Sequence, residues 1–334
     1  MRRVPPRIII KPVGSLNETF DKLVLFIVKS VYLIHRVLIR MIFGKTRREV
    51  ILQEANKKLH YTQILSGRFS PSFYFISILY GFKLTRKLDR KHQMLFKVKV
   101  PKYSYRIYCP PFKNDFIGVT TREEDIIDNY FNPAEGDTVI DIGAHIGRYT
   151  LIASKRVGSS GLVVAVEPDP SNIEMLNKNI ELNNLANIQI LHCAACAEQK
   201  KIRLYLPGKN SEISIYNTIM QDRAHSSQRS IEVEGYTLNF IADKYSEQID
   251  ENAEKEIWIK IDVEGAEYEV LKGATNLLRK NRAISILMEI HNLREGFNLF
   301  EPIIKLLREY DFHLEFEKVY DGGEKHIVLK KHLI

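Results

Sequence analysis

The hydrophobic and polar positions in the middle of the chain predict strands and helices that alternate. Short aliphatic runs have the length of buried strands, and between them apolar residues recur every three or four positions, which is typical of helices. The predicted strands and helices are, in chain order, residues 138–141, 148–155, 162–167, 171–184 and 188–193. Because strands joined by helices pair in parallel, this pattern predicts an α/β fold, a parallel sheet with helices on both faces.

The same alternation continues after a polar interval. Residues 256–261 and 283–288 are two further apolar runs, which we expect to be the fourth and fifth core strands. Residues 122–131 predict a helix ahead of the first strand. Residues 206–235 are polar and rich in serine, so we expect an irregular connection there, and a connection this long is often a lid over a substrate.

The N-terminal third has a different pattern. Residues 23–43 are apolar for long enough to cross a bilayer, but three basic residues interrupt them, and each costs roughly 3 kcal/mol near the centre of a membrane. Lys22, Lys29 and Arg36 are spaced by seven, so they fall on one stripe of a helix. This spacing predicts a basic amphipathic helix that lies on an anionic membrane surface, or else a helix that packs on the rest of the protein.

Charge divides the chain in the same place. Residues 1–115 contain 24 Lys and Arg against 6 Asp and Glu, a net of +18, whereas the remaining residues contain 25 against 35, a net of −10. We therefore expect a basic, partly helical and aromatic N-terminal extension at 1–115, with its amphipathic helix at about 20–43, and a second domain at 116–334. Anionic lipid or nucleic acid would bind the extension, because a basic surface attracts both.

Cysteine usage indicates the compartment. Cys109, Cys193 and Cys196 are too few for a disulfide framework, and the single Cys-x-x-Cys has no second pair with which to complete a zinc site. We interpret Cys193 and Cys196 as buried residues at the end of a strand. A reducing compartment follows, so we expect a cytoplasmic protein, or one held peripherally at the inner membrane surface.

The turn after the first core strand predicts a nucleoside cofactor. Gly143 and Gly147 bracket it between a strand and a helix, and a glycine lets the backbone approach a ligand closely because it carries no Cβ. The second strand ends in Glu167, twenty residues after Gly147. In a doubly wound sheet a carboxylate at this position binds the hydroxyl groups of a ribose.

The residues of this turn favour S-adenosylmethionine over a dinucleotide. A nicotinamide cofactor requires G-x-G-x-x-G around its pyrophosphate, whereas here Asp141 precedes the first glycine and only one more glycine follows. An acid suits a cofactor that carries a cationic sulfonium and an amino group, and it opposes a pyrophosphate. The residues expected to bind S-adenosylmethionine are Asp141, Gly143, Ala144, His145, Gly147 and Glu167.

Acidic residues and a histidine follow the fourth and fifth strands. Asp262 and Glu264 come after the fourth strand, and Glu289 and His291 come after the fifth, so all four are expected at the carboxyl edge of the sheet. Methyl transfer to a hydroxyl requires a base, and we expect these four residues to be catalytic, with His291 as the natural candidate. Alternatively, Asp262, Glu289 and His291 bind a divalent cation that acidifies the hydroxyl. Glu267 either caps the next helix or joins this group.

Two longer motifs resemble a known family. Residues 257–273 contain Lys-Ile-Asp-Val-Glu-Gly-Ala-Glu, and residues 286–292 read Ile-Leu-Met-Glu-Ile-His-Asn. Together with the glycine turn and the Val-Ala-Val-Glu-Pro strand end, they resemble the FkbM family of methyltransferases over roughly residues 116–330. The resemblance implies a Rossmann-like methyltransferase sheet, S-adenosylmethionine, and O-methylation of a sugar hydroxyl in a glycan or glycolipid. His145 stands where the family usually has Asn, and both side chains can donate a hydrogen bond.

Two other functions stay open. The first is an RNA methyltransferase that holds nucleic acid with the basic extension. Nucleic acid is the less favoured acceptor, because enzymes that methylate base amines usually carry Asn/Asp-Pro-Pro-aromatic after the fourth strand, where this chain has Asp262-Val-Glu-Gly. The second is a non-catalytic scaffold with the same fold. The intact cofactor motifs and the acidic strand ends favour an enzyme over a scaffold. The serine-rich residues 206–235 suit a polar, hydroxylated acceptor, and the family resemblance implies that this acceptor is a carbohydrate.

Overall fold

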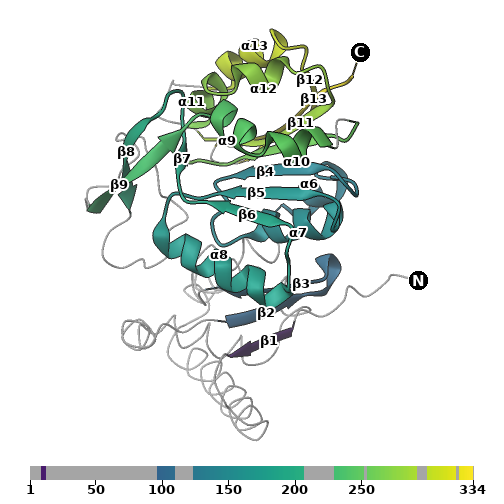
Figure 1. Cartoon of the computed structure of the whole chain (residues 1–334), viewed down its shortest axis with the longest axis vertical. Helices are drawn as coiled ribbons and strands as arrows, with labels where there is room; N and C mark the ends of the chain where they lie inside the picture. Colours follow the sequence, from purple (N-terminus) through teal and green to yellow (C-terminus); the bar gives the residue numbers. More distant parts are fainter. Residues whose placement is uncertain are drawn as a thin grey trace, which may run out of the picture. The chain divides into compact units, whose positions relative to one another are not determined.

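The chain divides into two compact units, Met1–Thr120 and Thr121–Ile334, each of which is described by itself. The computed structural model describes residues 9–12, 96–109, 123–206, 229–251, 254–291, 299–320 and 323–333 (Figure 1). The amphipathic helix predicted at about 20–43 lies outside these ranges, so its contact with a membrane stays a prediction. Among the helices that the structure describes, none has the length and apolar character needed to cross a membrane.

The described part of the first unit is a small antiparallel sheet. Strand β1 (Ile9–Pro12) pairs with β2 (Phe96–Val100), and β2 pairs with β3 (Tyr105–Cys109). The short 3-10 helix η1 (Pro101–Tyr103) joins β2 to β3. The described part of residues 1–115 therefore consists of strands and a short 3-10 helix, and the basic surface that the composition predicts stays a prediction.

The second unit is built on a seven-stranded, mostly parallel sheet with the order β12-β13-β11-β10-β4-β5-β6. Its strands are β4 (Thr138–Ile142), β5 (Leu162–Val166), β6 (Ile188–Leu191), β10 (Ile257–Ile261), β11 (Ile284–Ile290), β12 (His313–Val319) and β13 (Lys325–Lys331). Only β13 runs antiparallel to its neighbours on both sides. The chain order reverses at β4, which has β5 on one side and β10 on the other. The predicted Rossmann-like sheet is confirmed.

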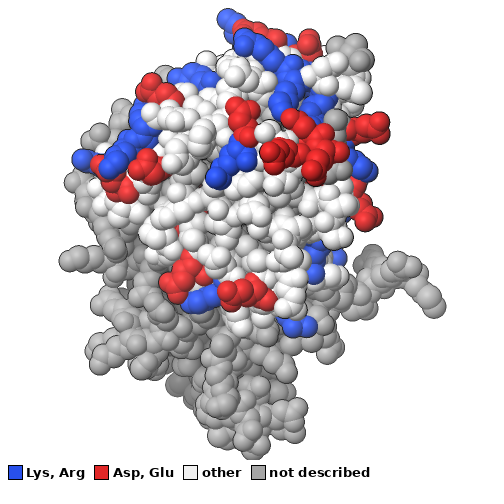
Figure 2. Space-filling view, in the orientation of Figure 1, with Lys and Arg blue, Asp and Glu red and all other residues white. Residues whose placement is uncertain are grey.

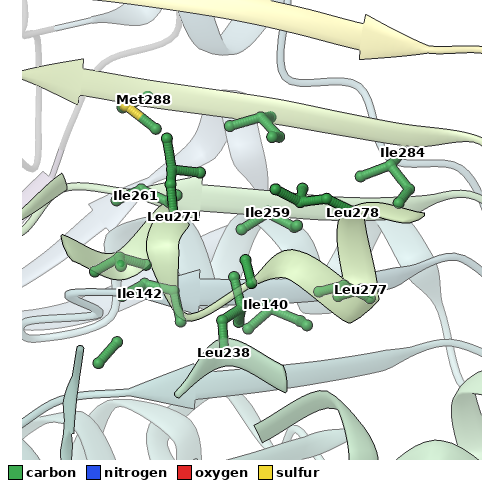
Figure 3. Packing of buried hydrophobic residues seen from close by; sticks show 14 of the residues in the cluster. Ile140, Ile142, Leu238, Ile259, Ile261, Leu271, Leu277, Leu278, Ile284 and Met288 are labelled. Carbon is green, nitrogen blue, oxygen red and sulfur yellow. The ribbon is translucent and has the colours of Figure 1, made fainter. Parts of the chain in front are cut away.

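Helices cover both faces of this sheet, because successive strand residues point to opposite sides. On one face, Ile140, Ile259 and Ile286 pack in the main core with Leu238 and Leu271 of the covering helices (Figure 3). Those helices are α9 (Leu238–Lys244), α10 (Ser246–Glu251), α11 (Glu267–Lys272), α12 (Thr275–Arg279) and α13 (Phe300–Arg308).

The opposite face carries the helices that follow the first two core strands. Helix α7 (Arg148–Val157) packs on β4 and β5, and α8 (Pro170–Asn183) places Leu176 against Ala165. The short helix α6 (Glu124–Asn129) lies where residues 122–131 predict one. Because both α7 and α8 begin directly after a strand, their first residues lie at the carboxyl edge of the sheet.

The prediction of an irregular connection at residues 206–235 is wrong for its last part, which is a strand. Strand β9 (Arg229–Tyr236) pairs antiparallel with β8 (Lys200–Leu206) and parallel with the two-residue β7 (Ala194–Ala195). The reason is alternation: Ile231 and Val233 face a small core, while the intervening Glu232 forms an ion pair with Lys201 at 2.9 Å. The polar residues between Ile231 and Val233 and around them make the segment look irregular, although apolar residues recur there at every second position. Residues 207–228, the rest of the predicted lid, lie outside the described residues.

Candidate functional site

The glycine turn joins β4 to α7 and is tied to the neighbouring strand. The backbone N–H groups of Gly143 and Ala144 both donate to the carbonyl of Val166, at 2.9 and 3.0 Å, and Gly147 donates to Ala144 at 2.9 Å. The side chain of Ala144 packs in a small cluster with Leu176. These bonds hold the turn against the end of β5, the strand that leads to the predicted ribose ligand.

Gly143 is required by its neighbours, whether or not a ligand also requires it. Its φ is +80°, and a Cβ built on it would lie 1.9 Å from the carbonyl oxygen of Asp262. Gly147 has a φ of +98°, and its Cβ would lie 2.5 Å from a methyl group of Leu176. The close approach of β4 and β10 at the point where strand order reverses therefore depends on a glycine.

We expect Gly143→Ala to lower the free energy of unfolding by at least about 1–3 kcal/mol, because the contact is with backbone that cannot move aside. Gly136→Ala is the matched control: its φ is +87°, near that of Gly143, but its Cβ would meet only the flexible side chain of Lys255 at 3.0 Å. Urea unfolding of the two variants checks this. Equal stabilities would show that the contact with Asp262 does not constrain the turn.

Glu167 lies at the end of β5 and joins the turn to the helix that follows. Its carboxylate accepts hydrogen bonds from the backbone N–H of His145 at 2.8 Å and of Asp169 at 2.9 Å, and from the side-chain amide of Asn172 at 3.0 Å. Burial raises the pKa of Glu167 to about 7, although these three donors work in the other direction. The two predicted cofactor residues Glu167 and His145 are thus brought into direct contact.

His145 adopts a backbone conformation that suits its place in the turn. Its φ is +51°, in the left-handed region. Asn, Asp and His occupy this region more readily than most residues. The exchange of Asn for His at this position, where the chain departs from the family pattern, therefore costs the turn little.

Asp141 is buried inside the sheet. None of its surface is exposed, and its carboxylate accepts a hydrogen bond from the hydroxyl of Thr150 at 2.6 Å. The ammonium of Lys260 lies 3.5 Å from its other oxygen. In this structure Asp141 connects β4, α7 and β10, and its predicted contact with the cofactor stays a prediction.

Lys260 links the glycine turn to the acidic strand ends. Its ammonium donates to the carbonyl of Gly143 at 3.0 Å and lies 3.4 Å from a carboxylate oxygen of Asp262. Burial alone would lower the pKa of Lys260, but the charges of Asp262 and Asp141 outweigh it and raise the pKa. A charged amine therefore holds both parts of the candidate site together.

Three of the four predicted catalytic residues, Asp262, Glu264 and Glu289, lie around the fourth, His291. Its Nε2 lies 3.6 Å from Glu264 and 3.9 Å from each of Asp262 and Glu289. One donor atom each from Asp262, Glu264 and His291 fall within 4.8 Å of one another, a group that could hold a metal ion. Asp262 is the most exposed, with 31% of its side-chain surface accessible, whereas His291 is buried at 4%. Asp262 and Glu264 are therefore closer to the solvent than the imidazole is.

Glu289 lies deeper than predicted, because β11 extends to Ile290 instead of ending at residue 288. It faces His326 in the register of β11 and β13, and one of its oxygens lies 3.3 Å from that imidazole. Glu123, Glu289 and His326 form a second group whose donor atoms fall within 4.8 Å. Glu123 also accepts a hydrogen bond from the hydroxyl of Tyr149 at 2.8 Å. No motif in the sequence indicates Glu123 or His326, since each is close to Glu289 only through the fold.

Glu267 joins the group around His291, and it also accepts a hydrogen bond from a backbone amide of the turn before α11. As the first residue of α11 it is fully buried, and it accepts a hydrogen bond from the backbone N–H of Gly265 at 2.9 Å. The same oxygen lies 2.8 Å from Nδ1 of His291. Glu267 therefore holds the turn before the helix, and it also holds the imidazole of His291, which lies deeper than Asp262 and Glu264.

The charges of the site set its protonation. Burial would lower the pKa of His291, but the hydrogen bond to Glu267 and the charges of Glu267, Glu264 and Asp262 outweigh it and raise the pKa to about 10. Burial would raise the pKa of Asp262, but the charges of Lys260 and His291 lower it to about 2. At neutral pH the isolated protein thus holds an imidazolium beside ionised Asp262, rather than the neutral imidazole expected from the intrinsic pKa.

The predicted Cys193 and Cys196 are both buried and free, as expected of strand-end residues. Burial raises the pKa of the Cys193 thiol to about 12 and also raises that of Cys196. Because the thiolate is the form that binds metal and attacks electrophiles, neither cysteine contributes to the chemistry of the site.

Comparison with known proteins gives three similarities. "Methyltransferase 1" of Beauveria bassiana is 24% identical over 150 residues, which cover 40% of this chain and 57% of that protein, little more than half its length. The hexuronic acid methyltransferase AglP of Haloferax volcanii is 29% identical over 203 residues, 57% of this chain and 75% of that protein. Among solved structures, the methyltransferase FkbM of Methylobacillus flagellatus KT is 17% identical with a TM-score of 0.37, over 59% of this chain and 44% of that chain.

A family model also matches this chain. It is described as the methyltransferase FkbM domain and matches residues 141–314, more than half of the chain. The match begins at Asp141, in the strand before the glycine turn, and extends past His291 into β12. It therefore contains the glycine turn, Glu167 and the acidic group, by which we mean Asp262, Glu264, Glu289 and His291. This chain belongs to the FkbM methyltransferase family.

Proposed function

We propose that the protein is an S-adenosylmethionine-dependent O-methyltransferase that acts on a hydroxyl of a sugar in a glycan or glycolipid. The observation that carries the proposal is the link made by Lys260. Its ammonium contacts the glycine turn at Gly143 and the acidic strand end at Asp262, which supports a cofactor site and a deprotonating site that would lie side by side. Methyl transfer to a hydroxyl requires both.

The residues of the turn fit S-adenosylmethionine. In the described part of the chain, the Glu167 oxygen that faces His145 accepts one hydrogen bond, and a carboxylate oxygen has room for a second. A ribose hydroxyl is a donor of the right kind. Gly143 and Gly147 keep side chains away from the same edge of the sheet. The bound cofactor would supply an electrophilic methyl group on a sulfonium, and Glu167 would hold its ribose.

The acidic group would take the proton of the acceptor. We assign this step to Nε2 of His291, because Nδ1 is engaged by Glu267 and Nε2 faces Asp262 and Glu264. Asp262 is a poor base at neutral pH, since the charge of Lys260 holds its carboxylate ionised. Its exposed oxygen is better suited to accept a hydrogen bond from the acceptor and orient it toward the imidazole.

The rate should rise with pH. Because the pKa of His291 is raised to about 10, the neutral imidazole that accepts a proton is the minor form at neutral pH and becomes dominant only in the alkaline range. We expect kcat to rise by up to about tenfold per pH unit between neutral pH and the pKa. A pH profile with saturating substrates checks this, and a rate that is flat over the alkaline range would exclude His291 as the base.

The sugar acceptor is supported by a relative and by the family resemblance. AglP is named as a hexuronic acid methyltransferase, and it aligns with more of this chain than the Beauveria protein does. RNA is the competing acceptor, because residues 1–115 carry a net charge of +18. Most of residues 1–115 lie outside the described residues, so RNA stays open as an acceptor. Elsewhere on the face in Figure 2, described basic side chains lie next to acidic ones. Ion pairs such as Lys200 with Glu198 are of this kind.

The test offers both acceptors to the same protein. Methyl-labelled S-adenosylmethionine is incubated with extracted glycolipids in one reaction and with total RNA in another. We expect label in the glycolipid fraction, and none in either fraction with Asp262→Asn. Label confined to RNA would support the alternative function. Tight cofactor binding without transfer to any extract would favour the non-catalytic scaffold.

A divalent cation is the alternative source of acidity. Carboxylates and an imidazole suit several divalent metals, and the structure replaces Glu289 by Glu264 as the nearest partner of Asp262 and His291. Lys260 lies 3.4 Å from Asp262, so a cation there would have to tolerate a neighbouring ammonium. The cation would polarise the acceptor hydroxyl, while His291 and Asp262 would hold it.

We also expect the basic extension to bind anionic membranes. Lys22, Lys29 and Arg36 fall on one helical stripe in a stretch without acidic residues. Each basic residue near an anionic surface contributes about 1 kcal/mol. Flotation with anionic vesicles should recover the protein at low salt and release it at high salt. Resistance to high salt and to carbonate would instead indicate a membrane span, and no flotation would favour a helix packed on the protein.

A further inference from the structure

We propose that Glu267 is the residue that positions the base: it holds the His291 imidazole through Nδ1 and thereby presents Nε2 to the acceptor hydroxyl. This inference rests on the proposed methyl transfer to a hydroxyl. Glu267 touches neither cofactor nor acceptor in this scheme, so it acts only through His291.

The geometry of the pair carries the inference. Glu267 is fully buried at the start of α11, and His291 follows β11 with 3% of its surface exposed. The carboxylate oxygen and Nδ1 lie 2.8 Å apart, while Nε2 has no neighbour among Asp262, Glu264 and Glu289 closer than 3.6 Å. The short contact is on the side of the ring away from the exposed Asp262. Among the residues that the structure describes, the imidazole is therefore hydrogen-bonded through Nδ1 and not through Nε2.

This anchoring determines the tautomer. An ionised carboxylate only accepts hydrogen bonds, so Nδ1 of His291 must carry its proton when it faces Glu267. When the ring is neutral, the lone pair that can accept a proton is then on Nε2. Without Glu267, the proton can move to Nε2, and the nitrogen that faces Asp262 and Glu264 loses its basicity.

The hydrogen bond to the turn alone does not account for Glu267. The backbone N–H of Gly265 uses one carboxylate oxygen, and the other is buried without a hydrogen-bond partner among the described residues. Leaving a buried acceptor unsatisfied costs about 1–3 kcal/mol. A carboxylate that only held the turn could lie at the surface, where water would satisfy its second oxygen. The contact with His291 gives a reason for a carboxylate at this buried position.

The same oxygen also shapes the turn in front of the imidazole. Glu264 and Gly265 both have positive φ, at +55° and +104°. The hydrogen bond from Gly265 to Glu267 holds this turn, and Glu264 lies 3.6 Å from Nε2 of His291. One buried side chain thus sets both the ring and an acid in front of it.

Glu267→Ala and Glu267→Gln separate positioning from structure. The Gly265 N–H requires an acceptor, so it should keep the oxygen of a glutamine amide where the carboxylate oxygen is, still facing Nδ1. Alanine removes the acceptor altogether. Glu269→Ala is the control on the same helix, because Glu269 is a partly exposed residue that pairs with Lys272.

With methyl-labelled S-adenosylmethionine and extracted glycolipids, we expect Glu267→Ala to lower kcat about 10²–10⁴-fold, within the range seen when a base is lost or misoriented. The half-saturating amounts of both substrates should change by less than about threefold, since neither touches Glu267. Glu267→Gln should recover most of kcat, and Glu269→Ala should match the wild type.

Imidazole nitrogen NMR gives a second measurement that needs no acceptor. At a pH above the His291 pKa of about 10, where the ring is neutral, we expect the His291 proton on Nδ1 in the wild type and in Glu267→Gln, and a mixture of tautomers in Glu267→Ala. If the alanine variant fails to fold, the position of the His291 proton in the wild type and in Glu267→Gln still tests the proposal. A wild-type His291 protonated on Nε2 alone would overturn the proposal.

Kinetic outcomes can overturn it as well. An alanine variant with unchanged kcat would do so, and so would alanine and glutamine variants that both lose cofactor affinity and thermal stability together, since that is a structural role. If His291→Ala is inactive while Glu267→Ala is active, only the positioning role fails. If His291→Ala is fully active, the proposed base itself is wrong.

Discussion

His291→Ala and Asp262→Asn should each lower the rate of methyl transfer about 10²–10⁴-fold and leave the affinity for S-adenosylmethionine nearly unchanged. The reason is position. Both residues follow the ends of β10 and β11, where they contact each other, whereas Glu167 and the glycine turn hold the cofactor from β4 and β5. Kinetics with labelled cofactor and calorimetry on the same preparations measure the two effects separately.

His313→Ala is the control for the loss of a histidine, since His313 is exposed on β12, and it should keep full activity. The variants also test the cation. If a metal carries the acidity, a chelator should abolish wild-type activity and added Mg²⁺ or Mn²⁺ should restore it. Chelator-resistant activity at the wild-type level in both variants would show that the deprotonating group lies elsewhere.

Glu167→Ala should weaken S-adenosylmethionine binding by about 1.5–3 kcal/mol, the usual contribution of hydrogen bonds to a charged group. The carboxylate is already anchored by His145, Asp169 and Asn172, so it needs little rearrangement to accept the ribose hydroxyls. The same anchors mean that alanine also frees the backbone of the glycine turn, which adds to the loss.

Calorimetry measures this loss directly. Glu174→Ala is the matched control, because Glu174 lies on the next helix, exposed and paired with Lys178, and makes no contact with the turn. We expect the control to bind like the wild type. An unchanged affinity in Glu167→Ala would remove Glu167 from the cofactor site and leave it as an anchor of the turn alone.

The parts of the fold that the sequence predicts well are those with a dense apolar signal. Strands β4, β5 and β10 are fully or almost fully buried, and each carries aliphatic residues at every second position or more often, so their positions follow mainly from the apolar pattern. Their carboxyl ends then follow too, and with them Asp262 and Glu167. Parallel pairing brings these ends to one edge without any knowledge of loop structure.

Other parts depend on contacts that one segment does not encode. Strand β9 contains Arg, Ser and two Glu, and it is a strand because every second residue faces a core made with β8. Strand β11 runs past Met288 because β13 pairs with its last residues, which draws Glu289 inward beside His326. The pKa of His291 is likewise a property of its assembled acidic neighbours, and an intrinsic value does not predict it.

The chemical form of the transferred methyl group tests methylation of a hydroxyl most directly. Glycolipids labelled by the protein from methyl-labelled S-adenosylmethionine are treated first with mild alkali and then with acid, and the released sugars are identified by mass spectrometry. We expect the label to survive alkali and to appear on a sugar as an O-methyl ether, with none in reactions that contain His291→Ala. Label released by alkali as methanol, which marks a carboxyl ester, or label found only on nitrogen, would contradict it.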